Sequence, residues 1–353
     1  MIAALVGGQY GSEGKGLIAG HIGKRFGCHV RVGAANAGHT VVVDGSPFVL
    51  QQIPCAAYTS PNSRLVVGPG AVISEEILLR EIEENTQWRL DNDLPSLDLY
   101  IDRRAHVITD LMIEREQESD LAERIGSTST IAKEGIGTAT AARAMRDSEC
   151  VVAADVDSLQ DWISDTVGVV LQVYADMEGV LLEGTQGTGL SITTGQFPYC
   201  TSRNTTAAGL VADAGVPLTA VERSIMVCRT FPIRVAGNSG PFWHDSEELE
   251  WEDLKVDPNT ERTTVTKKVR RVASFSFAQV AEAAWLNGAT DIAITFTDYL
   301  DFDIYGKSGE MDFAYLSEYF PIVAEFVDKV ATTSGVPVSM LGTGPATVID
   351  LVQ

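Results

Sequence analysis

The stretch Ile2-Ala3-Ala4-Leu5-Val6, followed by Gly7-Gly8-Gln9-Tyr10-Gly11-Ser12-Glu13-Gly14-Lys15-Gly16, decides the fold class. A buried strand that ends in a glycine-rich turn and continues into a helix directs backbone N–H groups and the helix N-terminus towards one point, where an anion is stabilised. Lys15 adds a positive charge for the same anion. The spacing departs from the Walker A pattern, because Gln9 stands at its first glycine and Gly16 at its hydroxyl position. We therefore predict a phosphate-binding loop related to the Walker A loop; a plain strand-to-helix turn is the alternative.

Short apolar runs alternate with longer amphipathic segments along the rest of the chain, which is typical of a mostly parallel sheet covered by helices. The clearest strands are 65–67, 180–182, 224–227 and 291–294. Helices are expected at about 14–26, 74–84, 103–124, 139–146, 157–176, 204–214, 275–287 and 315–334. Asp44-Gly45 predicts a hairpin turn between 40–43 and 48–50. We expect an α/β fold with a mostly parallel central sheet flanked by helices; the length permits one domain or two, and we expect a single elaborated domain over 1–353.

The composition favours a soluble protein with small partners. The formal net charge of −22, from 48 acidic and 26 basic residues, repels nucleic-acid polymers and anionic membranes. The sequence lacks an apolar run of about 18 residues and a basic region ahead of its first apolar stretch, so neither membrane spanning nor secretion is expected. The five cysteines form no C-x-x-C pair and are odd in number, which disfavours a zinc site and a disulfide framework. We expect a cytoplasmic protein.

A basic cluster stands out against this acidic background. Five cations fall within ten positions: Arg262, Lys267, Lys268, Arg270 and Arg271. Such a cluster can bind the phosphates of a mononucleotide or can form the solvated face of a hairpin. The composition alone leaves both readings open.

Four further segments combine small residues with polar groups. They are Asn36-Ala37-Gly38-His39-Thr40, Glu183-Gly184-Thr185-Gln186-Gly187-Thr188-Gly189, the hydroxyl-rich 198–206 and Gly342-Thr343-Gly344-Pro345. Small residues let the backbone approach a ligand closely, and the second segment follows an apolar run, at the strand end where ligands of open α/β sheets bind. For 198–206 an ordinary polar loop is the alternative. Of the five histidines only His39 lies in such a segment, so we expect it to be the functional one.

Taken in order, these motifs resemble those of the adenylosuccinate synthetase family over essentially the whole chain. The family pattern runs G-Q-x-G-[DS]-E-G-K-G, N-A-G-H-T, E-G-x-Q-G-T, P-Y-x-T-S-x-N-T-T, a basic loop near 263–271 and G-T-G-P. The resemblance implies a two-step, Mg²⁺-dependent ligase. A nucleoside triphosphate phosphorylates the 6-oxygen of a purine monophosphate, and the amine of L-aspartate then displaces that phosphate. Lys15, backbone amides and a donor such as His39 suit the charge that develops during phosphoryl transfer.

The resemblance also implies a role for individual residues. The catalytic residues would be Ser12, Lys15, His39 and Gln186, with Ser12 and the Gly38 carbonyl on Mg²⁺. The triphosphate donor would contact Gly14, Lys15, Gly16, Gly38, His39, Thr40, Thr297, Asp298, Gly342, Thr343 and Gly344. The purine monophosphate would contact Ser12, Asn36, Ser127 or Thr128, Gln186 and Thr201, and Arg146 from the neighbouring subunit, which makes a homodimer the expected assembly. L-aspartate would contact Thr263, Thr264, Val265, Thr266, Lys268 and Arg270.

One departure from the family pattern concerns the purine. The family's general base is an aspartate in the first loop, and Ser12 replaces it here; a hydroxyl cannot act as a like-for-like base at neutral pH. Serine is shorter, leaves room beside C2 and can accept a hydrogen bond from a 2-amino group. A phage-type branch of the family, often called PurZ, has serine there and converts dGMP to N6-succino-2-amino-2'-deoxyadenylate, a precursor of 2-aminoadenine DNA. We adopt dGMP as the expected acceptor, which implies phage origin and host cytoplasm. The sequence leaves open whether Glu13, a metal-bound water or the phosphate takes the N1 proton.

Further departures concern the triphosphate donor and L-aspartate. The family usually has a T-K-x-D segment that reads the guanine of GTP, and Phe296 replaces its lysine while Asp298 remains. ATP or dATP is therefore the expected donor. Lys267 and Lys268 stand where the family tends to have glycine and arginine, so the aspartate contacts are expected to differ. The alternatives are an ordinary synthetase that acts on IMP with GTP or ATP, and an inactive nucleotide-binding protein.

Overall fold

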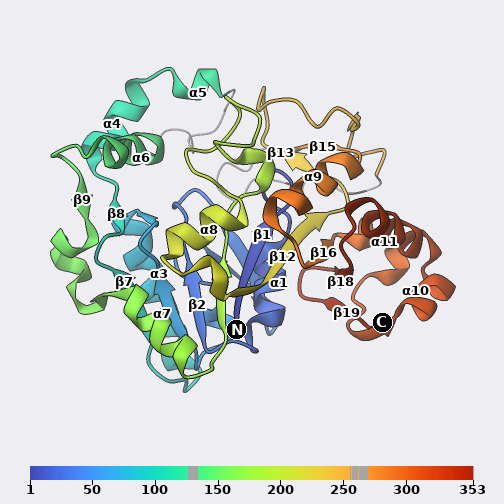
Figure 1. The fold of residues 1–353 in the computed structure, drawn as a ribbon, viewed down its shortest axis with the longest axis horizontal. Helices are drawn as coiled ribbons and strands as arrows, with labels where there is room; N and C mark the ends of the chain where they lie inside the picture. The colour runs from blue at the N-terminus through green and yellow to red at the C-terminus, as the bar shows by residue number, and fades with distance from the viewer. Residues whose placement is uncertain (126–133, 255, 257–260, 262–268, 353) are drawn as a thin grey trace.

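The computed structural model describes residues 1–125, 134–254, 256, 261 and 269–352. Within these residues a sheet of eleven strands forms the centre of the molecule (Figure 1). All neighbouring strands are parallel except the pair β18–β19. In spatial order the strands are β10 (Ile163–Ser164), β7 (Leu99–Asp102), β5 (Arg64–Val67), β2 (Cys28–Arg31), β11 (Val180–Glu183), β1 (Ile2–Gly7), β12 (Val221–Arg229), β16 (Asp291–Thr295), β18 (Val338–Gly342), β19 (Val348–Val352) and β17 (Gly309–Asp312). The predicted mostly parallel sheet is confirmed.

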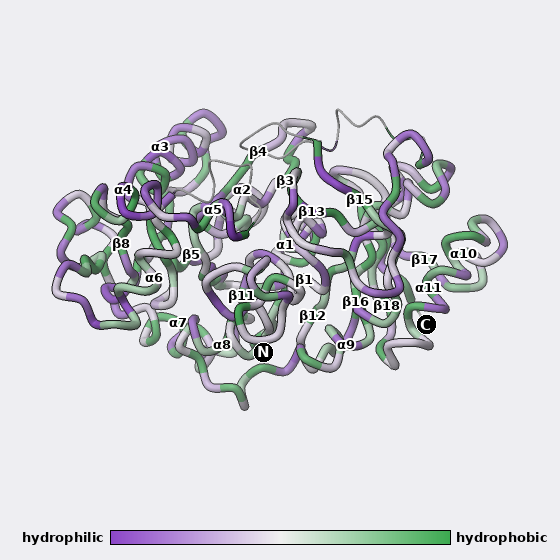
Figure 2. Tube along the Cα trace, turned by 90° about the horizontal axis from the view of Figure 1, so that it is seen from above, coloured by the Kyte–Doolittle hydropathy of each residue, from purple (hydrophilic) through white to green (hydrophobic). Residues whose placement is uncertain are grey.

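Helices cover both faces of this sheet. The helices in the described part of the chain are α1 (Lys15–Gly23), α2 (Ala56–Thr59), α3 (Glu75–Asp91), α4 (Asp110–Glu118), α5 (Leu121–Arg124), α6 (Ile136–Met145), α7 (Thr166–Ala175), α8 (Ala207–Ala214), α9 (Phe277–Asn287), α10 (Phe313–Tyr319) and α11 (Pro321–Ser334). Of these, α4 and α6 pack in a separate hydrophobic cluster beside the sheet. Seen from above in Figure 2, α1, α2 and α3 lie on one side of the central strands and α7, α8 and α9 on the other. None of the described helices is long and apolar enough to cross a membrane.

The side-chain alternation of the buried strands builds a hydrophobic core on each face. In β1, Ile2, Ala4 and Val6 pack into the core that α7, α8, α9 and α11 cover, whereas Ala3 and Leu5 pack into the core below α1, α2 and α3. Successive side chains of a strand point to opposite faces, so a strand covered on both sides reads as a continuous apolar run. This explains why the four predicted strands stand out in the sequence.

Smaller sheets flank the central one. Antiparallel strands β3 (His39–Val43) and β4 (Ser46–Leu50) form the predicted hairpin, and Asp44 and Gly45 at its turn have φ of 50° and 79°. Both values lie in the left-handed region that a type I′ turn requires. The other small sheets are β6 (Val72–Ile73), β8 (His106–Val107) and β9 (Val151–Val152), and β13 (Ile233–Arg234), β15 (Arg271–Ala273) and β14 (Glu248–Leu249).

Three of the predicted helices are wrong in part. The segment 103–124 contains β8 before α4 and α5, and 157–176 contains a 3₁₀ turn and the edge strand β10 before α7. The segment 315–334 contains two helices, α10 and α11, which are separated at Phe320 because Pro321 restricts the residue before it. In the first case His106 and Val107 pair with β6 and β9, and Thr109 caps α4 by accepting from the Met112 N–H. Hydrophobic periodicity is a local signal and does not reveal a two-residue strand whose partners lie more than thirty residues away.

The strand order reverses at β1. In space, β11, β2, β5 and β7 lie in this order on one side of β1, and β12, β16 and β18 lie on the other side. Ligands of open α/β sheets bind at such a switch point, beyond the carboxyl ends of the strands. The residues that follow β1, β2, β11, β12 and β16 are therefore the expected place of a ligand site.

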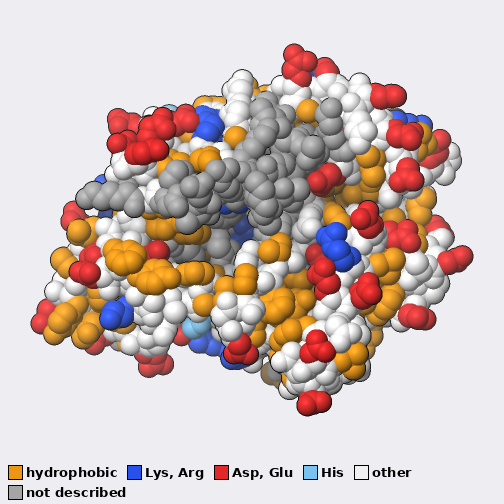
Figure 3. All heavy atoms as spheres, turned by 180° about the vertical axis from the view of Figure 1, so that it is seen from behind, with side chains coloured by type: hydrophobic (Ala, Val, Ile, Leu, Met, Phe, Trp, Pro, Cys, Tyr) orange, Lys and Arg blue, Asp and Glu red, His pale blue; other side chains and the backbone are white. Residues whose placement is uncertain are grey.

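Acidic side chains spread over the face shown in Figure 3, in agreement with the net charge of −22.

Candidate active site

The glycine-rich loop after β1 is organised by one buried carboxylate. Glu13 is fully buried, and its Oε1 accepts hydrogen bonds from the backbone N–H groups of Gln9 (3.1 Å) and Gly11 (2.7 Å). Its Oε2 accepts from Lys15 Nζ at 2.6 Å. Glu13 therefore holds the loop and the lysine in place, and both of its oxygens are occupied, which argues against Glu13 as the base that takes a purine proton.

Two glycines allow Glu13 to lie inside the loop. A Cβ on Gly7 would lie 2.6 Å from Glu13 Oε2, and a Cβ on Gly187 would overlap Glu13 Oε1. Atoms that are not bonded do not approach so closely, so any side chain at either position would displace the carboxylate. The loop after β1 and the loop after β11 thus pack together through Glu13, which explains why both are glycine-rich.

Ser12 lies at the tip of the first loop. Its φ of 55° places it in the left-handed region, and its side chain is exposed. The Ser12 carbonyl accepts a hydrogen bond from Arg229 Nη1 at 3.3 Å, but within the described part of the chain the Ser12 hydroxyl forms no hydrogen bond. The backbone at this position is therefore held while the side chain is available to a ligand.

His39 is held by charged groups at the ends of two neighbouring strands. Arg31 ends β2 and Glu183 ends β11, and the two are direct partners in the sheet register. Glu183 Oε1 lies 2.6 Å from His39 Nδ1 and 2.5 Å from Arg31 Nη1. Cys55 Sγ also donates to Glu183 Oε1, at 3.2 Å. Because Arg31 already supplies the positive charge beside this carboxylate, the arrangement is a hydrogen-bond network rather than a metal site.

The electrostatics of this network leave His39 neutral. Burial, followed by the positive charge of Arg31, lowers the pKa of His39 to about 4. Burial alone would raise the pKa of Glu183, but Arg31 and the hydrogen bond from His39 hold it below its usual range. The neutral ring donates from Nδ1 to Glu183, so Nε2 keeps its lone pair and takes a proton when a nearby anion raises the pKa of His39.

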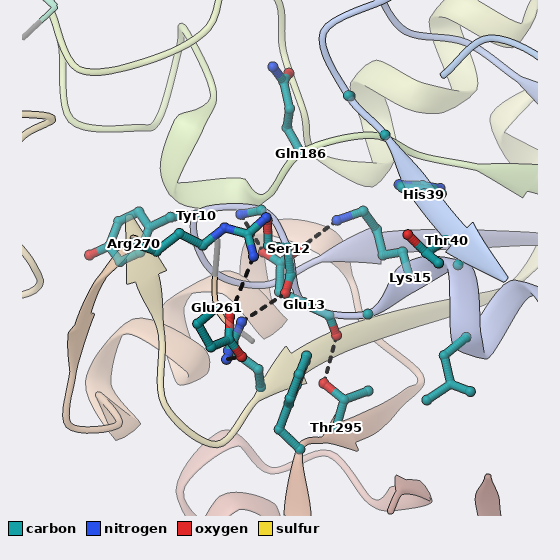
Figure 4. A pocket seen from close by; sticks show the side chains of 18 of the residues that line it. Tyr10, Ser12, Glu13, Lys15, His39, Thr40, Gln186, Glu261, Arg270 and Thr295 are labelled. Carbon is teal, nitrogen blue, oxygen red and sulfur yellow. Dashed lines mark hydrogen bonds and ion pairs between the residues drawn. The ribbon is translucent and has the colours of Figure 1, made fainter. Parts of the chain in front are cut away.

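A cavity of about 630 Å³ lies beside these residues. Figure 4 shows Lys15, His39, Thr40 and Gln186 around it, with Glu261 and Arg270 at the opposite end. Twelve of the seventeen predicted site residues that the structure describes line it: Ser12, Gly14, Lys15, Gly16, Asn36, Gly38, His39, Thr40, Gln186, Arg270, Asp298 and Gly344. The structure therefore brings together segments that are distant in the sequence.

Four of these residues carry a buried polar atom that has no hydrogen-bond partner in the described structure. The atoms are Asn36 Oδ1, His39 Nε2, Gln186 Oε1 and Asp298 Oδ1. Buried polar atoms are nearly always paired in folded proteins, so a group of unpaired atoms around one cavity needs an explanation. A polar ligand that fills the cavity and pairs with them provides it.

Another wall of the cavity is formed by the segment after β16. Thr295 Oγ1 donates to the Glu13 carbonyl at 2.6 Å, which joins this segment to the glycine-rich loop. Phe296 has a φ of 58°, and the Arg229 guanidinium lies 3.9 Å from its ring centre. Burial raises the pKa of Asp298. This wall combines an aromatic face with a carboxyl group, which suits a nucleobase.

The remaining predicted residues lie away from the cavity or outside the described structure. Thr297 and Thr343 are fully buried beneath the cavity, where Thr297 Oγ1 donates to the Gly342 carbonyl. Thr201 is partly buried beside Leu190, and Arg146 is exposed at the end of α6. The following predicted residues lie outside the described part of the chain: Ser127, Thr128, Thr263, Thr264, Val265, Thr266 and Lys268.

Comparison with known proteins decides the family. The family model "Adenylosuccinate synthetase" matches residues 4–154 and 148–303. The chain belongs to the adenylosuccinate synthetase family. The adenylosuccinate synthetase of Methanocaldococcus jannaschii is 36% identical over 97% of this chain and 93% of its own. That of Archaeoglobus fulgidus is 34% identical over 98% and 97%.

Two solved structures have the same fold. Succinoaminodeoxyadenylate synthetase (PurZ) of cyanophage S-2L, bound to dGMP and to dATP as an energy donor, has a TM-score of 0.80 and 28% identity, with 98% of this chain and 93% of that chain covered. Fully ligated adenylosuccinate synthetase from Plasmodium falciparum has a TM-score of 0.83 and 22% identity, with 99% of each chain covered. The chain is thus an adenylosuccinate synthetase-type ligase that forms a C–N bond, as the motifs predicted.

Several important residues that line this ligase's cavity or contact its lining escaped the sequence analysis. Arg31, Glu183, Arg229 and Glu261 received no role, although each is almost fully buried. Three of them end strands β2, β11 and β12. A charged residue directly after an apolar run was the available signal, because a charge is buried there only when it is paired or bound to a ligand. Glu261 carried no such signal.

Proposed function

We propose that this ligase couples L-aspartate to dGMP, with ATP or dATP as phosphate donor and Mg²⁺ as cofactor, and yields N6-succino-2-amino-2'-deoxyadenylate. The observation that carries the proposal is the position of Ser12. It lies on the cavity wall, where ordinary members of the family carry a carboxylate, and its hydroxyl has no hydrogen-bond partner among the described residues. The neighbouring carboxylate of Glu13 cannot replace it, because both of its oxygens bind the loop and Lys15.

A hydroxyl at this position favours a 2-amino purine. The Ser12 oxygen can accept a hydrogen bond from an exocyclic amine, and its small size leaves space at the C2 edge. A carboxylate in the same place would instead accept the N1 proton of a purine without that amine. The cyanophage enzyme, which is bound to dGMP, is consistent with this preference, although its identity to this chain is lower than that of the archaeal synthetases.

The cavity offers groups for both chemical steps. The loop amides and Lys15 hold the triphosphate while the γ-phosphoryl group passes to O6 of the purine and the bond to the β-phosphate breaks. The amine of L-aspartate then forms a bond to C6, and the C6–O bond breaks with phosphate as the leaving group. His39 Nε2 takes a proton from the solvent when the phosphate charge raises the pKa of the ring, it donates a hydrogen bond to the phosphoryl oxygens, and Glu183 stabilises the resulting imidazolium. Gln186 pairs with the purine.

The donor set is compatible with Mg²⁺. The Ser12 hydroxyl and the Gly38 carbonyl are both neutral oxygen ligands at the cavity, and Mg²⁺ prefers oxygen and usually completes its shell with phosphates and water. With Glu13 occupied, most ligands must come from the nucleotide. When bound, the metal would neutralise charge on the transferring phosphate.

Phe296 and Asp298 support an adenine donor. Asp298 can accept hydrogen bonds from the 6-amino group of adenine, and Phe296 offers a face for stacking, whereas a cation that would bind the guanine 6-oxygen is absent from residue 296. The cyanophage enzyme uses dATP as an energy donor.

Arg146, exposed and away from this chain's own cavity, is suited to reach a neighbouring subunit in a homodimer, and Arg270 would bind L-aspartate with the basic loop.

The second candidate function is that of an ordinary adenylosuccinate synthetase. It is favoured by the identity of 34–36% to archaeal synthetases over nearly the whole chain. In this case the acceptor is IMP.

A single assay separates the two candidates. The purified protein is incubated with L-aspartate, Mg²⁺, one purine monophosphate (dGMP, GMP or IMP) and one donor (ATP, dATP or GTP), and succinylated products are identified by mass spectrometry. We expect product from dGMP with ATP or dATP. Product from IMP with none from dGMP would overturn the dGMP assignment. Nucleotide binding without phosphate release in any combination would instead indicate an inactive protein.

A further inference from the structure

Glu261 lies where three parts of the cavity meet. Its carboxylate is 3% exposed. Oε1 accepts hydrogen bonds from Arg229 Nη2 and from the Tyr299 hydroxyl, each at 2.8 Å, and Oε2 accepts from Arg270 Nη1 at 3.4 Å. Figure 4 shows Glu261 below the guanidinium of Arg270, which itself lies beside Ser12.

The two arginines differ in how firmly they are held. Arg229 is 1% exposed, its guanidinium stacks on Phe296, and it also donates to the Ser12 carbonyl. Arg270 has Glu261 as the only hydrogen-bond partner of its side chain within the described residues. The charge of Arg229 disfavours a second cation nearby and lowers the pKa of Arg270, after the larger effect of burial. The position of Arg270 therefore depends on the negative charge of Glu261.

The net charge of Glu261, Arg229 and Arg270 allows these three residues to bind an anion. Burial alone would raise the pKa of Glu261, but Arg229, Tyr299 and Arg270 hold it below its usual range, so the carboxylate is charged at neutral pH. Two guanidinium groups around one carboxylate leave one net positive charge at the cavity wall. A substrate carboxylate can bind that charge without displacing the arrangement.

We propose that Glu261 is a positioning residue that joins Arg229 and Arg270 into one unit, and that it thereby sets the affinity for L-aspartate together with that for the donor nucleotide. The proposal rests on the assignment of Arg270 to L-aspartate and of the Phe296 segment to the donor base. It does not depend on which purine is the acceptor. Glu261 acts through the two arginines and does not itself contact the reacting atoms.

The test is Glu261→Gln, which keeps the size of the side chain and removes its charge. Without the carboxylate the two buried guanidinium groups repel each other, and Arg270, the less firmly held, moves. We expect the KM for L-aspartate to rise at least tenfold and the KM for the donor at least threefold, while kcat falls less than threefold and the KM for the purine changes less than twofold. Kinetics use whichever purine monophosphate the wild type turns over.

Two control variants separate positioning from a structural role. Tyr299→Phe removes one hydrogen bond to the same carboxylate but keeps its charge, and the KM for L-aspartate should stay within twofold of wild type. Glu248→Gln removes an exposed carboxylate that pairs with the adjacent Arg271 through two hydrogen bonds of 2.6 and 2.7 Å, and it should leave all three KM values unchanged.

Calorimetry of L-aspartate binding in the presence of the purine monophosphate and a non-hydrolysable ATP analogue involves no turnover, so it separates failure of this proposal from failure of the proposed reaction. An unchanged L-aspartate affinity in folded Glu261→Gln would overturn the proposal, as would an equal loss in Tyr299→Phe. If Glu261→Gln does not fold, Glu261→Asp decides. That variant keeps the charge but retracts it by one methylene, and the affinity for L-aspartate should fall at least threefold; an unchanged value would overturn the proposal.

Discussion

The glycine-rich loop and the segment after β16 adjoin each other along one cavity, and they hold their variable residue in different ways. In the loop, Glu13 and Lys15 satisfy each other and the backbone, so the Ser12 side chain contributes nothing to the loop's own structure. In the segment after β16, Phe296 is packed under Arg229 and against Tyr299. A substitution at residue 12 therefore alters the ligand alone, whereas one at residue 296 also alters the surroundings of Arg229.

This difference indicates how specificity can change in the family while the fold is kept. Thr295 joins the two regions through its hydrogen bond to the Glu13 carbonyl, and Arg229 joins them through Phe296 and the Ser12 carbonyl. The two regions that would bind the acceptor and the donor are thus connected. At Phe296 the side chain itself makes the connecting contact, whereas at Ser12 only the backbone carbonyl does. Substitutions in each region test this contrast.

The largest effect is expected from removing the carboxylate that organises the loop. Glu13→Ala leaves Lys15 and two backbone N–H groups unpaired in a buried site. Breaking a buried ion pair on one side costs about 3–5 kcal/mol of unfolding free energy. We expect such a loss in urea unfolding and the disappearance of ligase activity.

The matched control is Glu84→Ala, which removes an exposed pair with Arg80 at 4.0 Å and should change the unfolding free energy by about 0.5 kcal/mol or less. If Glu13→Ala is as stable as this control, the loop does not depend on its internal carboxylate, and the contrast between the two regions fails.

The contrast also indicates what the sequence can predict. The phosphate loop, the Asp44-Gly45 hairpin and the central strands were predicted because their signals are local: glycine spacing, turn residues and apolar runs. The partners of Arg229 could not be predicted, because Ser12 lies 217 residues before it and Glu261 lies 32 residues after it. The site was predicted as a set of motifs, and its internal ion pairs required the fold.

Ser12→Asp should change the acceptor without disturbing the loop. Aspartate tolerates the left-handed backbone at this position, and its carboxylate can take the N1 proton of IMP but crowds the C2 edge of guanine. A positioned general base typically contributes about 100-fold or more, so we expect kcat/KM for IMP relative to dGMP to rise by about that factor. Steady-state kinetics with both purines measure it.

Ser12→Gly is the companion variant. Glycine accepts the same φ and removes only the hydroxyl, so the preference for dGMP should weaken without any gain for IMP. A ratio that stays the same in both variants would show that residue 12 does not face the purine.

A pH effect of intermediate size is expected from two buried histidines, His39 at the cavity and His29 in β2. Burial lowers the pKa of both His29 and His39 from 6.5 to about 4. Between these values the unfolded chain binds more protons than the folded chain, so the stabilisation is complete above pH 6.5 and is lost as the pH falls towards 4. Each histidine contributes a slope of up to about 1.4 kcal/mol per pH unit. Urea unfolding from pH 6.5 to 5 should show it.

His29→Phe isolates one of these contributions. The substituted ring still packs near Phe26 but no longer titrates. The slope of the unfolding free energy against pH should therefore decrease by the contribution of one histidine, even if the variant is less stable overall. His244→Asn, at an exposed position, should leave the slope as in the wild type. An equal slope in all three proteins would mean that His29 is protonated in the folded state.

The smallest effect is expected at the donor end. Phe296→Leu keeps an apolar side chain but removes the aromatic face below Arg229 and beside the donor base, and a cation–π contact is worth about 0.5–2 kcal/mol. We expect the KM for ATP to rise by about twofold to thirtyfold, which corresponds to that range, with the KM for the purine monophosphate nearly unchanged. Phe302→Leu is the control, because Phe302 is 75% exposed and stacks only on Tyr305 among the described aromatic residues. If Phe296→Leu raises both KM values equally, residue 296 acts on the acceptor end through Arg229, and the two regions form one specificity unit rather than two.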